Sequence, residues 1–368
     1  MMWYTSWKHS HGKIQNSMAH KYKYSRIIRI WLIIGLVMLI GQVILGGITR
    51  LTGSGLSITK WDIVSGVMPP LNQQQWEQAF DLYKLTPQYH KINSHFTLSD
   101  FKFIYFWEYA HRLWVRILGF IFLIPFIIFL IGKKIDTYLV KRLMLVVLLT
   151  GLTASAGWIM VLSGLINRPW VNAYKLTLHF VLALLSITVM VKTIADVYNY
   201  TNDKKSKLKG LLVLLLSLTF LQMVFAGLMA GMKAGLFYPS WPDMNGYFIP
   251  EVLLKQNNWN TENLKNYDSF LFAPALVQFT HRMLAYLLVF FTGYLYFKYR
   301  NRVLSPASIW LIISFVLIIS QLALGILTVL NVNPGIPLFY GVMHQLTGLL
   351  YLISLLFFYY SVQTKKAS

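Results

Sequence analysis

Residues 103–131 read FIYFWEYAHRLWVRILGFIFLIPFIIFLI, an apolar run whose ionisable side chains all lie in its first half. About 20 apolar residues are enough for a helix to cross the hydrocarbon core of a bilayer. This run is longer, and Glu108, His111 and Arg112 lie close together within it. Ionisable residues inside a membrane span are costly and usually functional. The stretch therefore predicts a membrane helix that carries part of a functional site.

The whole chain has the composition of a membrane protein. Hydrophobic residues make up 56% of the 368 residues and charged residues 12%, and the mean hydropathy is +0.54. Soluble domains contain about 25% charged residues, so this composition excludes a water-soluble protein and a disordered one. The absence of cysteine excludes disulfides, thiolate metal sites, iron–sulfur clusters and cysteine nucleophiles.

Eight runs are long and apolar enough to span a bilayer. They cover residues 27–48, 103–131, 143–165, 176–197, 211–232, 270–296, 309–330 and 338–361. The first run is too long for a signal-peptide core and lacks a small-residue cleavage site, so we interpret it as a retained anchor. The fold class predicted is an all-α polytopic membrane protein.

The basic residues indicate how the chain is oriented. An even number of spans places both termini on one side, and that side collects 20 Lys and Arg residues, against 10 on the other. The positive-inside rule then predicts that both termini are cytoplasmic. The net charge of +21 is thereby explained as a topology signal, and no nucleic-acid partner is expected.

Two long loops are predicted on the outer side, over residues 49–102 and 233–269. Within the first loop, residues 72–83 are expected to form a short interfacial helix. Thr97 and Asp100 have the spacing of a capping box and would start the second span.

The chain contains an internal repeat. At an offset of 180 residues, seven identities occur between positions 42 and 70, where average residue usage would give about two. The pairs are Gln42/Gln222, Gly47/Gly227, Gly55/Gly235, Leu56/Leu236, Trp61/Trp241, Gly66/Gly246 and Pro70/Pro250. Further matches, at offsets of 165 to 170, are His111/His281, Arg112/Arg282, Gly157/Gly325 and His179/His344.

The repeat predicts two four-helix bundles in parallel orientation, because each copy has an even number of spans. We expect a basic cytoplasmic tail over residues 1–26, a first bundle over 27–198 and a second bundle over 199–368.

Four of the nine histidines lie within predicted spans, namely His111, His179, His281 and His344. They fall on the second, fourth, sixth and eighth spans, each a few turns from its outer end. Two histidines that face each other across a bundle suit axial ligation of a haem iron. The alternatives are interhelical hydrogen bonds and, less favoured, a bare metal site, for which two histidines leave the metal under-coordinated.

Arg112 and Arg282 each follow a histidine directly and are candidates for binding ligand carboxylates such as haem propionates. The alternative is that they extend to the outer interface.

The two halves differ at ionisable positions. Glu108 lies three residues before His111, on the same helix face, and its counterpart is Gln278. Arg50 is likewise matched by Ala230. A carboxylate in an apolar site can move protons, so we predict that the first half performs chemistry and the second holds a permanent cofactor. The alternative is an interfacial salt bridge between Glu108 and Arg112.

Other repeated residues have weaker interpretations. The glycines Gly47, Gly157, Gly227 and Gly325 are interpreted as points of close helix packing rather than parts of a site. Trp61 and Trp241 could cap the two bundles over their ligands.

Several motifs resemble those of the haem A synthase family, of the alphaproteobacterial and mitochondrial branch. They are GGITRLTGSGLSITKWDIVSGVMPP, KINSHFTLSDFKFIYFWEYAHR, LFYPSWPDMNG, QFTHRMLAYL and HQLTG, and the resemblance runs from about residue 27 to 360. Some bacterial members carry a cysteine pair in the first outer loop, which this chain lacks.

The resemblance implies an eight-helix enzyme that oxidises the ring C8 methyl of haem O to a formyl group, by successive hydroxylation and loss of water. His281 and His344 would ligate a resident haem B, His111 and His179 would face the substrate haem, and Glu108 stands at the family's essential glutamate. Partners implied are haem O, haem A and the bilayer, here a bacterial inner membrane. Haem O synthase, an electron acceptor and a second copy of the chain are further candidates.

Two other functions are compatible with four histidines in a duplicated chain. A non-enzymatic dihaem cytochrome would not explain why only one half has Glu108. A transporter would need access from both sides, whereas all four histidines lie toward the outer side.

Overall fold

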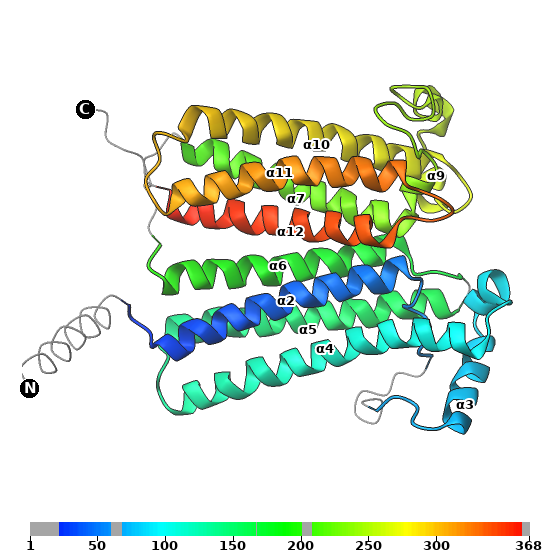
Figure 1. Ribbon diagram of the computed structural model, residues 1–368, viewed down its shortest axis with the longest axis horizontal. Helices are drawn as coiled ribbons and strands as arrows, with labels where there is room; N and C mark the ends of the chain where they lie inside the picture. The colour runs from blue at the N-terminus through cyan, green and yellow to red at the C-terminus, as the bar shows by residue number, and fades with distance from the viewer. Residues whose placement is uncertain (1–21, 60–67, 167, 201–207, 363–368) are drawn as a thin grey trace, which may run out of the picture.

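Eight long helices run side by side in the computed structural model, which describes residues 22–59, 68–166, 168–200 and 208–362 (Figure 1). They are α2 (Arg26–Leu51), α4 (Leu98–Ile131), α5 (Thr137–Leu165), α6 (Ala173–Val197), α7 (Leu208–Met232), α10 (Phe272–Tyr299), α11 (Ala307–Leu330) and α12 (Leu338–Ser361). Each is long and apolar enough to cross a membrane, and no β-strand occurs in the described residues. The predicted all-helical class and number of spans are confirmed.

The local start signals work as the sequence predicts. The Thr97 side chain accepts from the Asp100 N–H while the Asp100 carboxylate accepts from the Thr97 N–H, so the capping box is formed. Helix α4 therefore begins at Leu98, five residues before the apolar run that starts at residue 103. The loop helix is α3 (Gln73–Lys84), capped by the side chain of Asn72. Both predictions from the first long loop are therefore confirmed.

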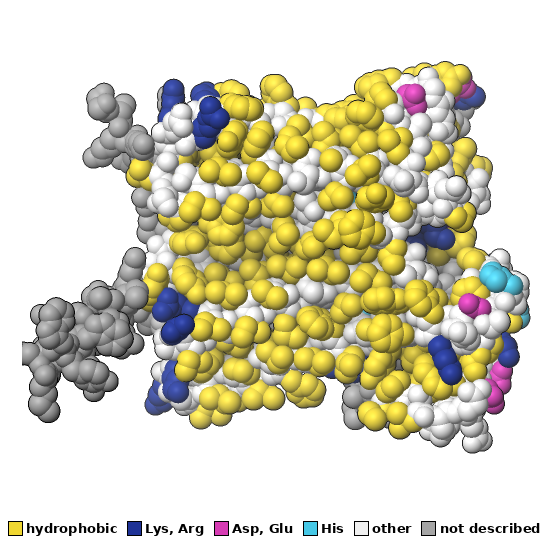
Figure 2. Space-filling view, viewed as in Figure 1, with side chains coloured by type: hydrophobic (Ala, Val, Ile, Leu, Met, Phe, Trp, Pro, Cys, Tyr) yellow, Lys and Arg dark blue, Asp and Glu magenta, His cyan; other side chains and the backbone are white. Residues whose placement is uncertain are grey.

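The two ends of the molecule differ. One end, which we name the loop end, carries α3, a π-helical turn (Tyr89–Asn93), α8 (Glu251–Leu254) and α9 (Thr261–Lys265). The first and last described residues, 22 and 362, lie at the opposite end, where the blue and red ends of the ribbon are (Figure 1). In Figure 2, hydrophobic side chains cover the face between these ends, Lys and Arg cluster near the termini, and both signs of charge occur at the loop end. This is the surface of a protein embedded in a bilayer.

Helices α6 and α12 form the centre of the assembly. They are the most buried spans, with 50% and 61% of their most apolar windows buried. Helices α2 and α7 contact both of them, whereas α5 contacts α6 and α11 contacts α12 farther out. The spans that carry His179 and His344 are therefore the two central ones.

Two repeated glycines lie where the halves meet. A Cβ on Gly47 of α2 would come within 2.2 Å of the Gln345 side-chain oxygen on α12, and one on Gly227 of α7 within 3.0 Å of Thr177 Oγ1 on α6. Small residues allow membrane helices to approach closely. These two glycines pack helices against each other.

Candidate functional site

The histidines of the second half lie opposite each other. His281 extends from α10 and His344 from α12, and their ring centroids are 6.3 Å apart with the planes at 63°. Imidazole nitrogens bind first-row metals at about 2 Å, so one metal ion fits between the two rings, and the rest of the separation corresponds to the ring radii. The sequence expectation that this pair faces across a bundle agrees with the geometry.

The surroundings of His344 prepare one nitrogen for a metal. Its Nδ1 lies 3.1 Å from the Gln321 backbone carbonyl, a contact that requires the proton on Nδ1. The Nε2 lone pair is then available as a ligand, as in metal sites where the second ring nitrogen binds a carbonyl. Gly325 lies against the ring, since a Cβ there would be 2.9 Å from His344 Cε1.

Two glutamines contact the nitrogens that face the gap. Gln321 Nε2 lies 3.2 Å from His344 Nε2, and Gln222 Nε2 lies 3.3 Å from His281 Nε2. Gln222 also donates to the His281 backbone carbonyl at 3.0 Å. The side-chain oxygens of both glutamines and His281 Nδ1 are buried without a partner among the described residues. Polar atoms are therefore concentrated at this pair.

The first half repeats the arrangement around its histidine on the central helix. His179 Nδ1 lies 2.8 Å from the Thr153 carbonyl, and a Cβ on Gly157 would be 2.9 Å from His179 Cε1. Thr153 and Gly157 are the counterparts of Gln321 and Gly325 at an offset of 168 residues. His111 and His179 are close enough to interact electrostatically.

The four repeated glycines make two kinds of close contact between helices. Gly157 and Gly325 make room for histidine rings, while Gly47 and Gly227 pack helices. The signal that could have separated them was their position, because each of the first two lies on the helix before a repeated histidine.

The residue beside the His111 ring differs from its counterpart in the second half. A Cβ on Gly46 would be 3.4 Å from His111 Nε2, and the matching residue in the second half is Ala226. Gln42 donates to the His111 carbonyl at 3.3 Å, as Gln222 does to His281. The backbone contact is thus repeated, but the space beside the imidazole is larger in the first half.

Glu108 is buried and has four donors. Its Oε2 accepts from the Ser57 N–H at 2.8 Å, the Ser57 hydroxyl at 2.7 Å and the Ile58 N–H at 2.9 Å. Its Oε1 accepts from Arg112 at 2.5 Å. The salt bridge that the sequence left as an alternative is therefore present, and it holds the carboxylate one turn from His111.

Arg112 and Arg282 bind the loop that follows the first span of each half. Arg112 donates to the Ile58 carbonyl at 3.2 Å, and Arg282 to the carbonyl of its counterpart, Tyr238, at 3.1 Å. Arg282 also donates to the carbonyls of Ser240 and Asp243 at 2.8 and 2.6 Å. Non-helical backbone at membrane depth must have its polar groups satisfied by protein, and these arginines do that at the level of the histidines.

Gln278 and Trp241 complete the second loop. Gln278, in the place of Glu108, donates to the Tyr238 carbonyl at 2.9 Å. The Trp241 indole donates to the Tyr286 hydroxyl at 3.0 Å, so it lies beside α10. Trp61 lies outside the described residues. The Ser240 hydroxyl and the Gly246 N–H lower the pKa of Asp243, which stabilises the turn that Arg282 holds.

The donor set suits a macrocyclic iron better than a bare ion. The described residues contain no group of three or more His, Asp or Glu side chains arranged to hold a metal. A bare metal needs about four protein ligands, whereas a haem brings four nitrogens and needs only axial ligands. Two facing imidazoles, with His344 Nε2 left as a ligand by its Nδ1 contact, fit that requirement.

Comparison with known proteins gives one consistent family. Residues 29–356 match the COX15-CtaA family model, described as a cytochrome oxidase assembly protein. Haem A synthase of Flavobacterium psychrophilum is 37% identical, over 88% of this chain and 94% of the relative. Those of Parvibaculum lavamentivorans and Bradyrhizobium diazoefficiens are each 38% identical, over 86% and 87% of this chain and 88% and 87% of the relatives.

Proposed function

The chain belongs to the COX15-CtaA family of cytochrome oxidase assembly proteins, and from this premise we propose how its two histidine pairs divide the work of a haem A synthase. The function is the conversion of haem O to haem A, in which the ring C8 methyl is oxidised to a formyl group. The protein is a multi-pass membrane enzyme.

The second pair, His281 and His344, would hold a resident haem B. The observation that supports this most is the 6.3 Å separation of their rings, together with the Nδ1 contact that leaves His344 Nε2 as a ligand. When bound, this haem supplies one-electron redox chemistry. The two glutamine amides and the glycine at position 325 would keep the imidazoles in a fixed orientation.

The first pair, His111 and His179, would bind the substrate haem. Glu108 would accept a proton as the methyl carbon is oxidised, because its carboxylate lies one helical turn from His111 and is held there by Ser57, Ile58 and Arg112. The second half has an amide at this position and cannot accept a proton in the same way. Arg112 and Arg282 remain candidates for the haem propionates, in addition to the loop carbonyls they bind.

The finer points of location and lineage are part of the proposal. Cytoplasmic termini are supported by the distribution of Lys and Arg in the sequence and by the basic residues near the termini in Figure 2. Membership of the alphaproteobacterial and mitochondrial branch is supported by the absence of cysteine. Haem O synthase, an electron acceptor and a second copy of the chain are the proposed partners.

The test is chromatography with mass detection of the haems extracted by acid–acetone. The protein is produced with a source of haem O in a host that lacks haem A. Haem A or its hydroxylated intermediate, together with haem B, is the expected result. Haem B alone with haem O unchanged would instead favour the dihaem cytochrome.

A further inference from the structure

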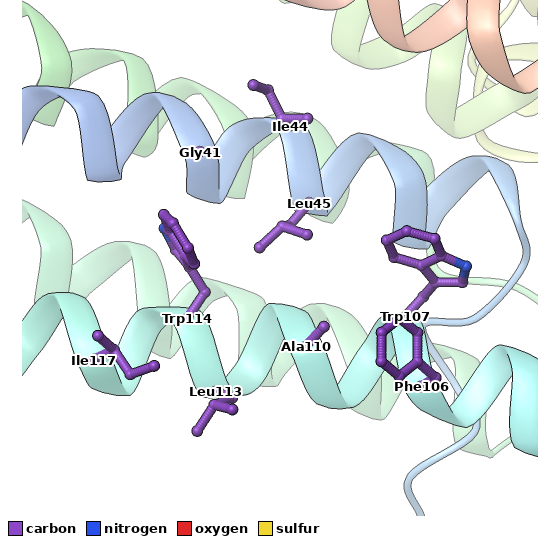
Figure 3. Close-up of a pocket in the computed structure, with 9 residues that line it drawn as sticks. All are labelled: Gly41, Ile44, Leu45, Phe106, Trp107, Ala110, Leu113, Trp114 and Ile117. Carbon is purple, nitrogen blue, oxygen red and sulfur yellow. The ribbon is translucent and has the colours of Figure 1, made fainter.

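An apolar groove runs along the contact between α2 and α4, on the membrane-facing side of the helix that carries His111 (Figure 3). Its volume is about 450 Å³. It is lined by Gly41, Ile44, Leu45, Phe106, Trp107, Ala110, Leu113, Trp114 and Ile117. Apart from one indole N–H, its walls are formed by hydrocarbon and aromatic side chains.

The groove lies next to the substrate side of the molecule. Ala110, which lines it, directly precedes His111, and Leu45 directly precedes Gly46, whose Cβ position is 3.4 Å from His111 Nε2. Trp107 and Trp114 stand one turn above and one turn below Ala110 along α4 (Figure 3). Leu45 and Ala110 lie between the two indoles, so the groove reaches the level of His111 along α4 (Figure 3).

Four positions at or beside the groove have larger residues in the second half. Gly41 and Leu45 of α2 correspond to Leu221 and Phe225 of α7, and Gly46 corresponds to Ala226. On the partner helix, Ala110 corresponds to Thr280, while Trp107 and Trp114 correspond to Val277 and Leu284, which are both buried. The lining thus differs between the halves: the half proposed to bind substrate has smaller residues at these four positions and two indoles where the second half has Val277 and Leu284.

The two haems differ in the same way. Haem O carries a long isoprenoid chain with a hydroxyl at its base, whereas haem B has a short vinyl group at that position. We propose that the α2–α4 groove holds the isoprenoid chain of haem O while His111 and His179 hold its ring. This inference rests on the proposed function and assigns the groove as a specificity subsite of it.

The isoprenoid chain would displace lipid from the groove because it is covalently attached to the bound haem ring. Lipid tails are as apolar as an isoprenoid, so burial alone gives little preference between them. A chain tethered to a ring bound beside the groove has a high effective concentration there. The groove offers almost no polar group to a ligand, which suits a hydrocarbon chain.

The experiment fills the groove with residues that the second half already uses. Leu45→Phe and Ala110→Thr are made in the protein with its resident haem, and Ile34→Phe, on the exposed face of α2 outside the groove, serves as control. Haem O and the tail-less haem B are titrated into each protein, and binding is followed by difference absorption. We expect both groove variants to weaken haem O binding about tenfold or more, with haem B binding and the control unchanged.

Equal weakening of both haems, or no change for either, would overturn the groove assignment. If wild-type protein binds haem O more tightly than haem B but forms no haem A, the proposed function fails and the groove assignment stands. If haem A forms but the wild-type protein binds haem O and haem B with equal affinity, the groove assignment fails and the proposed function stands.

Discussion

Arg50 binds the backbone of the residue that occupies its own position in the other half. Its Nη2 donates to the carbonyl of Ala230 at 2.6 Å and to that of Gly231 at 3.2 Å. Ala230 and Gly231 lie at the end of α7, where helix carbonyls lack intrahelical partners. The contrast between Arg50 and Ala230, which the sequence suggested as a sign of chemistry in the first half, is thus explained by contact between the halves.

The first prediction concerns this contact. Arg50→Met should lower the free energy of unfolding by about 2 kcal/mol, because charged donors to two helix-end carbonyls are lost. Thermal unfolding followed by resident haem absorbance measures the change. The double exchange of Arg50→Ala with Ala230→Arg should recover part of the loss, since the positions are equivalent. No recovery would show that the two sites are not interchangeable.

The second prediction concerns the carboxylate. Glu108→Gln should keep the resident haem and abolish the formyl product, because an amide cannot accept the proton. Extracted haems are analysed as described above. Ser57→Ala, which removes one donor and leaves the acid, should reduce the yield less. The control adds Gln278→Glu, at the matching position of the second half, to the Glu108→Gln variant. This double variant should not regain the product. Wild-type yield of haem A from Glu108→Gln would refute the role.

The third prediction separates the two histidine pairs by their glycines. Gly325→Ala should reduce resident haem content, because the new Cβ would lie 2.9 Å from His344 Cε1. Gly157→Ala should leave resident haem in place and reduce haem A formation, through the equivalent clash with His179. Gly151→Ala and Gly293→Ala are matched controls, since a Cβ at either meets nothing within 4 Å. Loss of resident haem in Gly157→Ala would contradict the division of labour.

The fourth prediction concerns acid stability at the end that carries the termini. The Lys23 ammonium, together with the Leu139 N–H and the Tyr24 hydroxyl, lowers the pKa of Asp136 from 3.8 to about 2. An acid with a depressed folded pKa stabilises the fold above its unfolded pKa, and the contribution is lost as the pH falls through the folded value. Asp136→Asn should therefore unfold at lower temperature than wild type at pH 6, and the gap should narrow between pH 4 and pH 2. A constant gap would exclude the ionic contribution.

Features that carry a periodic or repeated pattern could be predicted from the sequence. The eight spans, the capping box at Thr97 and the helix after Asn72 follow from apolar length and local start residues. The boundaries differed where helices continue past their apolar part, as α4 does by extending back to Leu98. Helix propensity and caps, not hydropathy, decide those ends.

Only some of the contacts that form the candidate site could be predicted from the sequence. The four histidines and Glu108 were found because they repeat, or fail to repeat, between halves. The glutamine contacts and the path of the loops along Arg112 and Arg282 depend on how non-periodic segments fold back, and no pattern encodes that path. Gln42 and Gln222 are among the repeated residues, and each donates to the backbone carbonyl of a histidine. Their repetition is a signal from which these contacts could have been predicted.

The Arg50 contact also bears on how such a chain could arise. In a symmetric pair of separate four-helix chains, an arginine at this position would face its own copy across the axis, and the two cations would repel each other. Joining the copies into one polypeptide allows one position to keep arginine while the other becomes alanine. In one polypeptide the contact can therefore be asymmetric, with its donor in one half and its two acceptors in the other.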